Sequence, residues 1–255
     1  MSHSDSIPRP FLSIVIPAHD EAGCVAETCR ALMAEFSRQG LSDYEILVVN
    51  DHSQDETGAV LQTLTAEYQN LRVITNPNPG GYGYAVRAGL AEYRGDAVAV
   101  VMADGSDSPA DVIAYYRALK NGAECVFGSR FMPGGLVTNY PVFKRILNRL
   151  ANWTIQAMFQ IPHNDITNAF KAYRREVIDG IQPLFSNHFN LTVEMPLKAI
   201  VRGFRFVKIP ISWTNRKAGE SKLKIKEMGS RYLFIILYCW LEKNLSRGDY
   251  RRPSG

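Results

Sequence analysis

Asp104 and Asp107 are the first candidates for chemistry in this chain, because they follow directly on an apolar stretch at residues 96–102. That stretch is too continuously apolar for a half-exposed strand, and Pro109 suits the first turn of a helix, so a buried strand followed by a helix is predicted. Both carboxylates would then lie at the carboxyl end of a strand, where open α/β sheets bind ligands. Together with the Ser106 hydroxyl they suit Mg²⁺ or Mn²⁺, which commonly bridges nucleotide phosphates. The alternative is that one aspartate only caps the helix.

Other stretches have the same form, an apolar strand that ends in polar residues before a helix. They are residues 11–16, 44–49, 71–74 and 124–127. This alternation predicts an α/β fold with a doubly wound, mostly parallel sheet flanked by helices. Because the carboxyl ends of parallel strands share one edge, we expect Asp51, Asp55, Asp104, Asp107 and Arg130 to converge on one crevice.

The glycine-rich loop at residues 80–85 does not indicate a nicotinamide enzyme. A dinucleotide fingerprint belongs after the first strand, where this chain has residues 17–21 instead. The glycines either let the backbone pass close to a ligand or form a turn.

After Arg130 the regular alternation stops. Periodicity predicts helices over 140–159 and from about 190 to 201, and a strand over 204–213. The basic segment at 215–226 follows. It could close over phosphates through Arg216 and Lys222, or it could be a solvated loop.

Two helices combine apolar with basic side chains. The helix over 140–159 contains Lys144, Arg145 and Arg149, and basic residues flank the apolar run at 232–241 in the final helix. Such helices suit the surface of an anionic membrane or the groove of a partner membrane protein. The alternatives are an ordinary surface helix and a core helix. The run at 232–241 is about half the length that spans a bilayer, so no transmembrane helix is expected.

With 255 residues, 46% hydrophobic and 21% charged, the chain has the composition of a globular protein. Its net charge of +4 gives no reason to expect nucleic acid as a partner. The cysteines lack the spacing of a zinc or thioredoxin-like site, and the polar start lacks the features of a signal peptide. A cytoplasmic protein is therefore expected, free or peripheral on the cytoplasmic face of a membrane.

Several motifs together resemble family 2 glycosyltransferases. Residues 17–21 resemble the P-x-x-N-E opening of that family, and residues 49–57 resemble its V-D-D-x-S-x-D-x-T motif. The glycine-rich loop, the aspartates, residues 128–130 and residues 209–223 then follow in the order found in dolichol-phosphate mannosyltransferase-like enzymes. The resemblance covers roughly residues 11–225.

This resemblance implies a GT-A fold over 11–225, between a flexible N-terminus (1–10) and a C-terminal amphipathic helix with a basic tail (226–255). It implies inverting transfer of a sugar from a GDP- or UDP-sugar donor, with a divalent cation as cofactor. The positions that match contacts to the base and ribose are Pro17, His19, Glu21, Val49 and Asp51. Those that match the surroundings of the diphosphate and metal are Ala103, Asp104, Arg130, Arg216 and Lys222. The last four of these are expected to be catalytic, since they would neutralise the leaving nucleoside diphosphate.

The acceptor region is implied by residues 165–171, which resemble the family's D-x-x-S-G-F-R and place Asp165, Asn168 and Lys171 on matching positions. A polyprenyl phosphate acceptor is already an anion and needs no general base. A hydroxyl acceptor, as in polysaccharide or glycolipid synthesis, would need a carboxylate, for which Asp165 and Glu194 are candidates.

The chain departs from the family at its D-A-D-x-Q motif, where it has Met102-Ala103-Asp104-Gly105-Ser106. The first acid and the glutamine are missing, so Ser106 and Asp107 are expected to complete the metal site with Asp104. The lost acid would also allow a non-catalytic nucleotide-sugar-binding protein. The retained Asp104, Arg216 and Lys222 argue against that interpretation.

Overall fold

The structure is a computed structural model that describes residues 11–215 and 225–252. The predicted flexible N-terminus (1–10) therefore lies outside the described residues. The same holds for Arg216 and Lys222 of the predicted basic segment.

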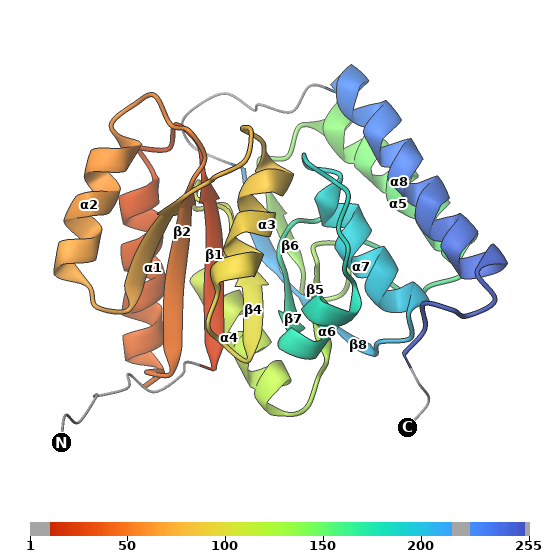
Figure 1. Ribbon diagram of the computed structural model, residues 1–255, viewed down its shortest axis with the longest axis horizontal. Coiled ribbons are helices and arrows are strands. Elements are labelled where there is room, and N and C mark those ends of the chain that lie inside the picture. The colour runs from red at the N-terminus through yellow and green to blue at the C-terminus, as the bar shows by residue number, and fades with distance from the viewer. Residues whose placement is uncertain (1–10, 216–224, 253–255) are drawn as a thin grey trace.

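A seven-stranded sheet forms the centre of the molecule, with the strand order β3-β2-β1-β4-β7-β5-β8 (Figure 1). Its strands are β1 (Leu12–Ala18), β2 (Tyr44–Asn50), β3 (Leu71–Thr75), β4 (Ala97–Val100), β5 (Cys125–Ser129), β7 (Lys171–Arg174) and β8 (Phe206–Pro210). Neighbouring strands pair in parallel except on both sides of β7, which is antiparallel to β4 and β5. The predicted mostly parallel sheet is confirmed.

Helices cover both faces of this sheet. They are α1 (Val25–Arg38), α2 (Thr57–Glu67), α3 (Tyr82–Glu92), α4 (Pro109–Lys120), α5 (Val142–Phe159), α6 (Arg175–Gly180), α7 (Leu191–Val201) and α8 (Ile225–Leu245). One apolar cluster joins α1, α2 and α4 to one face, and a second joins α3, α6 and α7 to the other. A third cluster packs α5, α7 and α8 together beside the sheet.

The central strands form because their side chains are apolar on both faces. All seven residues of β1 are buried, as are the middle five of β2, which is the pattern of a parallel strand with helices on each side. The register pairs Pro17 with Val49, so these two predicted site residues lie next to each other, buried in the sheet.

Two elements differ from the sequence-based expectation. Strand β7 was not predicted, because it is short and contains Lys171 and Arg174. The predicted single strand over 204–213 is divided at Ile211 into β8 and β9 (Ser212–Thr214). Strand β9 leaves the main sheet and pairs in parallel with β6 (Leu136–Thr138). The prediction of one continuous strand was wrong because alternation does not reveal the partner with which each half pairs.

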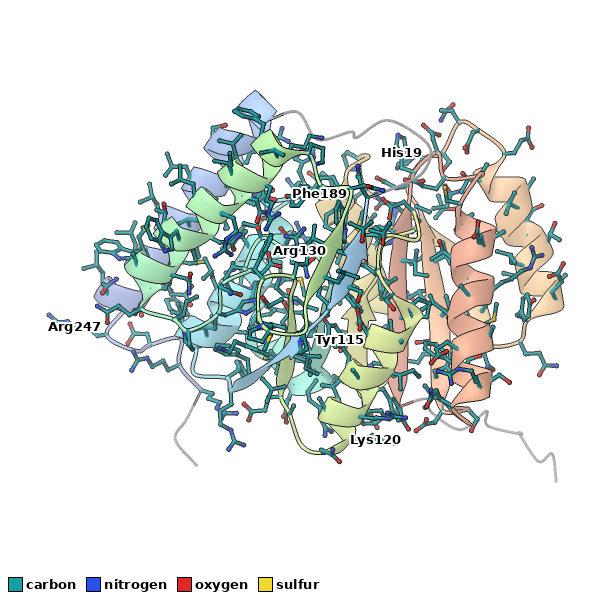
Figure 2. The ribbon with its side chains drawn as sticks, turned by 180° about the vertical axis from the view of Figure 1, so that it is seen from behind. His19, Tyr115, Lys120, Arg130, Phe189 and Arg247 are labelled. Atoms are coloured by element: carbon teal, nitrogen blue, oxygen red, sulfur yellow. The ribbon has the colours of Figure 1, made fainter. Side chains whose placement is uncertain are left out.

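Helices α5 and α8 lie side by side at one end of the molecule (Figures 1 and 2). Their outward faces expose large apolar side chains. On α5 these are Val142, Phe143, Ile146, Leu147, Leu150 and Trp153, and on α8 they are Leu233, Phe234, Leu237, Leu241 and Leu245. Within residues 11–215 and 225–252, no helix is long and apolar enough to cross a membrane.

The close packing of α3 on the sheet predicts an unusual effect of alanine at Gly89. A Cβ there would lie 2.5 Å from Cγ1 of Val15, so Gly89→Ala should destabilise the fold by about 1–3 kcal/mol. Gly229 of α8 is the matched control, because a Cβ there meets no described atom within 4 Å. Gly229→Ala should instead stabilise by about 0.5–1 kcal/mol, as alanine normally does inside a helix. Urea unfolding measures the change in the free energy of unfolding for both variants. Changes of the same sign would contradict the packing argument.

Candidate active site

The first two sequence motifs meet at the carboxyl ends of β1 and β2. His19 Nδ1 lies 2.6 Å from the carbonyl oxygen of Asp51, and the His19 ring is partly exposed. The Glu21 N–H donates to Thr57 Oγ1, so the loop after β1 is fastened to the start of α2. Figure 2 shows His19 at this edge of the sheet and Lys120 at the opposite edge.

The Asp51 carboxylate is buried and held by the glycine-rich loop. Its Oδ1 accepts a hydrogen bond from Asn76 Nδ2 at 2.7 Å, and its Oδ2 accepts one from the Gly81 N–H at 2.8 Å. The loop therefore fixes the orientation of the side chain that was predicted to contact the nucleoside.

The turn after β4 carries the predicted metal ligands. Asp104 Oδ1 accepts from the Ser106 N–H, and Asp107 Oδ2 accepts from the Met102 N–H at 3.0 Å. Helix α4 begins after Ser108 without a side-chain cap, so the alternative that an aspartate caps this helix is wrong. Buried Ala103 accepts a hydrogen bond from Thr28 through its carbonyl oxygen, which fastens the same turn to α1.

The charges of this turn fit a divalent cation. The pKa of Asp107 is raised to about 7, mainly by burial and also by repulsion from the Asp104 carboxylate, while the hydrogen bond from the Met102 N–H opposes the rise. A cation between the two carboxylates would remove that repulsion. The described part of the chain contains no group of three or more His, Cys, Asp or Glu side chains that could hold a metal. Two carboxylates would leave further coordination positions for phosphate oxygens and water, as is usual for Mg²⁺.

Strand β9 passes directly over this turn. The Thr214 N–H donates to the Ser106 carbonyl at 3.1 Å, and Trp213 forms a β-bridge with Asp107. Asn215, one residue later, donates its N–H to the Thr138 carbonyl of β6.

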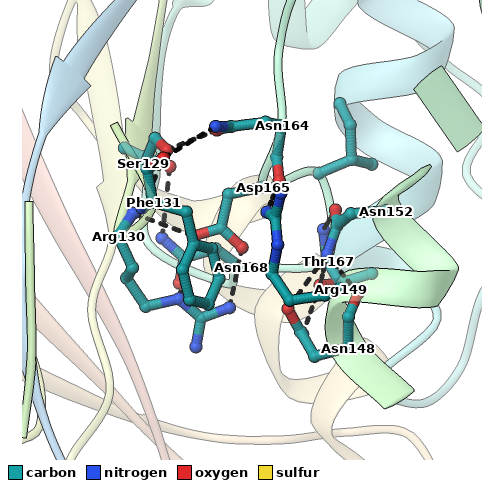
Figure 3. A network of polar contacts seen from close by, with 12 residues as sticks. Ser129, Arg130, Phe131, Asn148, Arg149, Asn152, Asn164, Asp165, Thr167 and Asn168 are labelled. Atoms are coloured by element: carbon teal, nitrogen blue, oxygen red, sulfur yellow. Dashed lines mark hydrogen bonds and ion pairs between the residues drawn. The ribbon is translucent and has the colours of Figure 1, made fainter. Parts of the chain in front are cut away.

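Arg130, which follows β5, forms a bidentate ion pair with Asp165. Its Nε and Nη2 lie 2.8 Å from Oδ2 and Oδ1, its backbone N–H also donates to Oδ2, and both side chains are buried (Figure 3). The rings of Phe131, Tyr140 and Trp213 lie 5.4–5.7 Å from the guanidinium carbon. Asp165 therefore orients the guanidinium through Nε and Nη2, and the contact of Arg130 with a diphosphate stays a prediction.

The loop before β7 is organised around this ion pair (Figure 3). Asn164 accepts a hydrogen bond from Ser129 and donates to the Phe131 carbonyl, and buried Asn168 donates to the Gly128 carbonyl. On the other side, Asn152 of α5 donates to Thr167 Oγ1 and accepts from its N–H.

Lys171 and Glu194 are buried as well. Lys171 Nζ donates to the carbonyl oxygens of Ile166, Asn168 and Thr192, and burial lowers its pKa to about 7. The Glu194 oxygens accept from the N–H groups of residues 185 and 186 and pair with Lys198 at 2.8 Å. Both side chains therefore brace α7 and the neighbouring loops, and their place on the acceptor side stays a prediction.

Sequence reasoning missed the aromatic side chains of the site. Trp213 and Tyr140 enclose Arg130, and Tyr82 stacks on Phe189 between the glycine-rich loop and the start of α7. Tyr82 lies inside the loop 80–85, and an aromatic residue among glycines was the feature of the sequence that could have indicated such a contact.

A model of the family described as Glycosyl transferase family 2 matches residues 13–181. The chain is 36% identical over 184 residues to polyprenol monophosphomannose synthase of Mycolicibacterium smegmatis, covering 70% of this chain and 69% of that protein. It is 31% identical over 219 residues to dolichol-phosphate mannosyltransferase of Pyrococcus furiosus, covering 84% of this chain but 60% of that protein. Undecaprenyl-phosphate mannosyltransferase of Micrococcus luteus is 30% identical over 82% of this chain and 86% of its own length.

Among solved structures, the chain is similar to glucosyl-3-phosphoglycerate synthase of Mycobacterium tuberculosis. The complex of that enzyme with Mn²⁺, UDP and glucosyl-3-phosphoglycerate gives a TM-score of 0.68 at 16% identity, covering 90% of this chain and 80% of the other. The complex with Mg²⁺ and UDP gives 0.67 at 16% identity, covering 90% and 79%. At this identity the similarity shows the fold, which confirms the predicted GT-A architecture.

The ion pair of Arg130 and Asp165 predicts a large loss of stability on neutralising one partner. Asp165→Asn should cost about 3–5 kcal/mol, because it leaves a buried guanidinium without a counter-charge. Asp43→Asn is the matched control, since Asp43 pairs with Lys120 at 2.8 Å on the exposed surface and should lose less than about 1 kcal/mol. Urea unfolding compares them, and similar losses would show that Asp165 is not the counter-charge of Arg130.

Proposed function

The chain belongs to glycosyl transferase family 2, and from that membership we propose that it transfers a sugar from a GDP- or UDP-sugar to a polyprenyl phosphate, with inversion at the anomeric carbon. The names of three relatives at 30–36% identity, all of them polyprenol, dolichol-phosphate or undecaprenyl-phosphate mannose enzymes, support this acceptor class. The chain spans 60% of the length of the Pyrococcus relative. The acceptor of that relative therefore comes to this chain only as a proposal.

The observation that carries the choice of acceptor is how Asp165 and Glu194, the two predicted candidates for a general base, are hydrogen-bonded. Both Asp165 oxygens accept hydrogen bonds from Arg130, and both Glu194 oxygens accept backbone N–H groups. A hydroxyl acceptor needs a base that can take its proton, and hydrogen bonds donated to a carboxylate make it a weaker base, whereas a phosphate monoester brings its own negative oxygen. The occupied carboxylates therefore favour a phosphate acceptor over a sugar or lipid hydroxyl.

On the donor side we assign the residues at the ends of β1 and β2 to the nucleoside. Asp51, oriented by Gly81, would accept hydrogen bonds from it, with His19, Glu21, Pro17 and Val49 at the ends of the same two strands. Ala103 would lie against the ribose and diphosphate through its backbone. All of these side chains stand on strands or strand ends, so little reorganisation is needed when the donor binds.

Asp104 and Asp107, with Ser106 between them, would hold Mg²⁺ or Mn²⁺ against the diphosphate. A bound divalent cation would supply Lewis-acid stabilisation of the leaving nucleoside diphosphate. Arg216 and Lys222 are assigned to the same diphosphate, because the chain leads into them from the Thr214–Ser106 contact. Arg130 acts as a positioning residue that holds the loop of Asp165 and Asn168, and Lys171 fastens that loop to α7.

We further propose that the exposed apolar faces of α5 and α8 lie on an anionic membrane surface, where a polyprenyl phosphate would be presented. Phe143, Trp153 and Phe234 are 67%, 70% and 64% exposed, and aromatic side chains favour the membrane interface. Exposed Arg145 and Arg247 stand on or beside the same two helices and would approach lipid phosphates.

A release assay tests the transfer. The full chain, given a panel of nucleotide sugars with Mg²⁺ or Mn²⁺, should release nucleoside diphosphate in the presence of undecaprenyl or dolichyl phosphate and not in its absence. Asp104→Ala should lower the rate by about 10²-fold or more, because it removes charge stabilisation at the leaving group. Asp179→Ala, an exposed aspartate on α6, is the matched control and should keep the full rate.

Other outcomes of this assay decide between the remaining functions. Release that ignores the lipid phosphate and responds to a sugar or lipid hydroxyl would replace the proposal with a hydroxyl-directed transferase. Binding of a nucleotide sugar without any release would replace it with a non-catalytic binding protein.

Sedimentation with vesicles tests the membrane surface. The chain should bind vesicles that contain anionic lipid more tightly than neutral ones, and less tightly in high salt. Replacing Phe143 and Trp153 with serine should weaken binding by about tenfold or more, since each buried aromatic contributes about 1.5–3 kcal/mol. Val207→Ser, at a 41% exposed position on β8, is the matched control. Equal binding by both variants would refute the assignment of this surface.

A further inference from the structure

The segment of residues 186–192, at the start of α7, contacts three parts of the site that are distant in sequence. It touches the glycine-rich loop on the donor side, α8 on the side of the exposed apolar surface, and Lys171 in the acceptor region. Its central residue, Phe189, is partly exposed and lies at the same edge of the sheet as His19 (Figure 2).

On the donor side this segment packs tightly against the glycine-rich loop. The ring of Phe189 is stacked on Tyr82, with centroids 4.4 Å apart and planes inclined by 10°. The Tyr84 N–H donates to the Asn187 carbonyl, and Arg87 donates to the Asn187 side chain at 2.9 Å. A Cβ at Gly83 would lie 2.5 Å from the carbonyl carbon of Asn187, so the two backbones are as close as glycine allows.

This contact reaches the donor site through one peptide unit. Gly81, which precedes Tyr82, donates its N–H to the Asp51 carboxylate. A shift of the Tyr82 ring would therefore move the Gly81 amide that orients Asp51. A displacement of the loop by about an ångström would lengthen that hydrogen bond beyond useful strength.

On the opposite side the same segment is held by α8. The Tyr232 hydroxyl donates to the Phe189 carbonyl at 3.1 Å, and Thr192 Oγ1 donates to the same oxygen at 2.7 Å. Burial raises the pKa of Tyr232 to about 12, which keeps its hydroxyl protonated as a donor. Tyr232 lies on the inner face of α8, and Leu233 and Phe234 next to it are exposed.

We propose that Phe189 is a positioning residue for donor binding: it holds the glycine-rich loop through its stack on Tyr82, and thereby Asp51, while Tyr232 of α8 holds Phe189. The inference rests on the proposed nucleotide sugar donor. It extends the proposed function in one respect. Helix α8, which is assigned to the membrane surface, would be connected to the proposed donor site as well as to the proposed acceptor region.

The test measures donor affinity directly, by calorimetry with the full chain and the nucleotide sugar that supports release. Phe189→Ala should weaken binding by about tenfold, equivalent to about 1.4 kcal/mol, and should raise KM for the donor with little change in kcat. Tyr232→Phe, which removes a single hydroxyl, should weaken binding by about threefold. Phe189→Tyr keeps the stack and should restore affinity to within about twofold of the wild type.

Tyr250→Phe is the matched control, because it removes a hydroxyl that lies near the other end of α8 and should leave donor affinity unchanged. Thermal melting identifies folded variants, and Tyr232→Phe decides the matter if Phe189→Ala does not fold. Wild-type affinity in folded Phe189→Ala and Tyr232→Phe overturns the inference, as does equal weakening by Phe189→Ala and Phe189→Tyr. A wild-type chain that binds no nucleotide sugar would overturn the proposed function itself, and this inference with it.

Discussion

The buried ion pair of Arg130 and Asp165 is the interaction on which the loop before β7, the predicted acceptor region, depends. Strand β7 runs antiparallel between β4 and β5, so the loop that enters it lies at the edge where its two neighbours end. Arg130 leaves β5 at that edge, and Asp165 stands in the entering loop. Desolvating both charges is expensive, and the bidentate geometry, the backbone N–H and the surrounding rings offset that cost. The pair is the buried charged contact of this loop, and the hydrogen bonds of Asn164, Thr167 and Asn168 hold the loop on either side of it.

The parallel part of the sheet could be predicted from the sequence, because strands that are buried on both faces are continuous apolar runs with polar ends. The sequence was insufficient for β7, whose lysine is buried only because three carbonyl oxygens surround it, and for the split between β8 and β9. The candidate residues at strand ends could be predicted too, because each of them directly follows one of these apolar runs. Contacts between distant loops, such as that of Tyr82 with Phe189, depend on tertiary packing that local patterns do not encode.

The turn after β4 departs from the family motif and still contains two carboxylates, those of Asp104 and Asp107. Met102 stands where the family has its first acid, and it contributes its backbone N–H to Asp107. The second carboxylate of the turn thus comes from a residue further along, and its orientation is fixed by the position that lost the acid. Strand β9 covers this turn through the contacts of Thr214 with Ser106 and of Trp213 with Asp107.

Helix α5 has one face that holds the loop before β7 and another that exposes apolar side chains, and the proposed lipid acceptor would use both. Its inner face holds the entering loop of β7, because Asn152 binds Thr167 and Arg149 donates to the Asn164 carbonyl. Its outer face presents Phe143 and Trp153 to the surroundings. An acceptor whose hydrocarbon chain stays in a bilayer under α5 would need to bring its phosphate past one helix to reach the loop of Asp165. Water-soluble acceptors gain nothing from this arrangement, so the exposed face of α5 and the occupied carboxylates favour the same acceptor class for independent reasons.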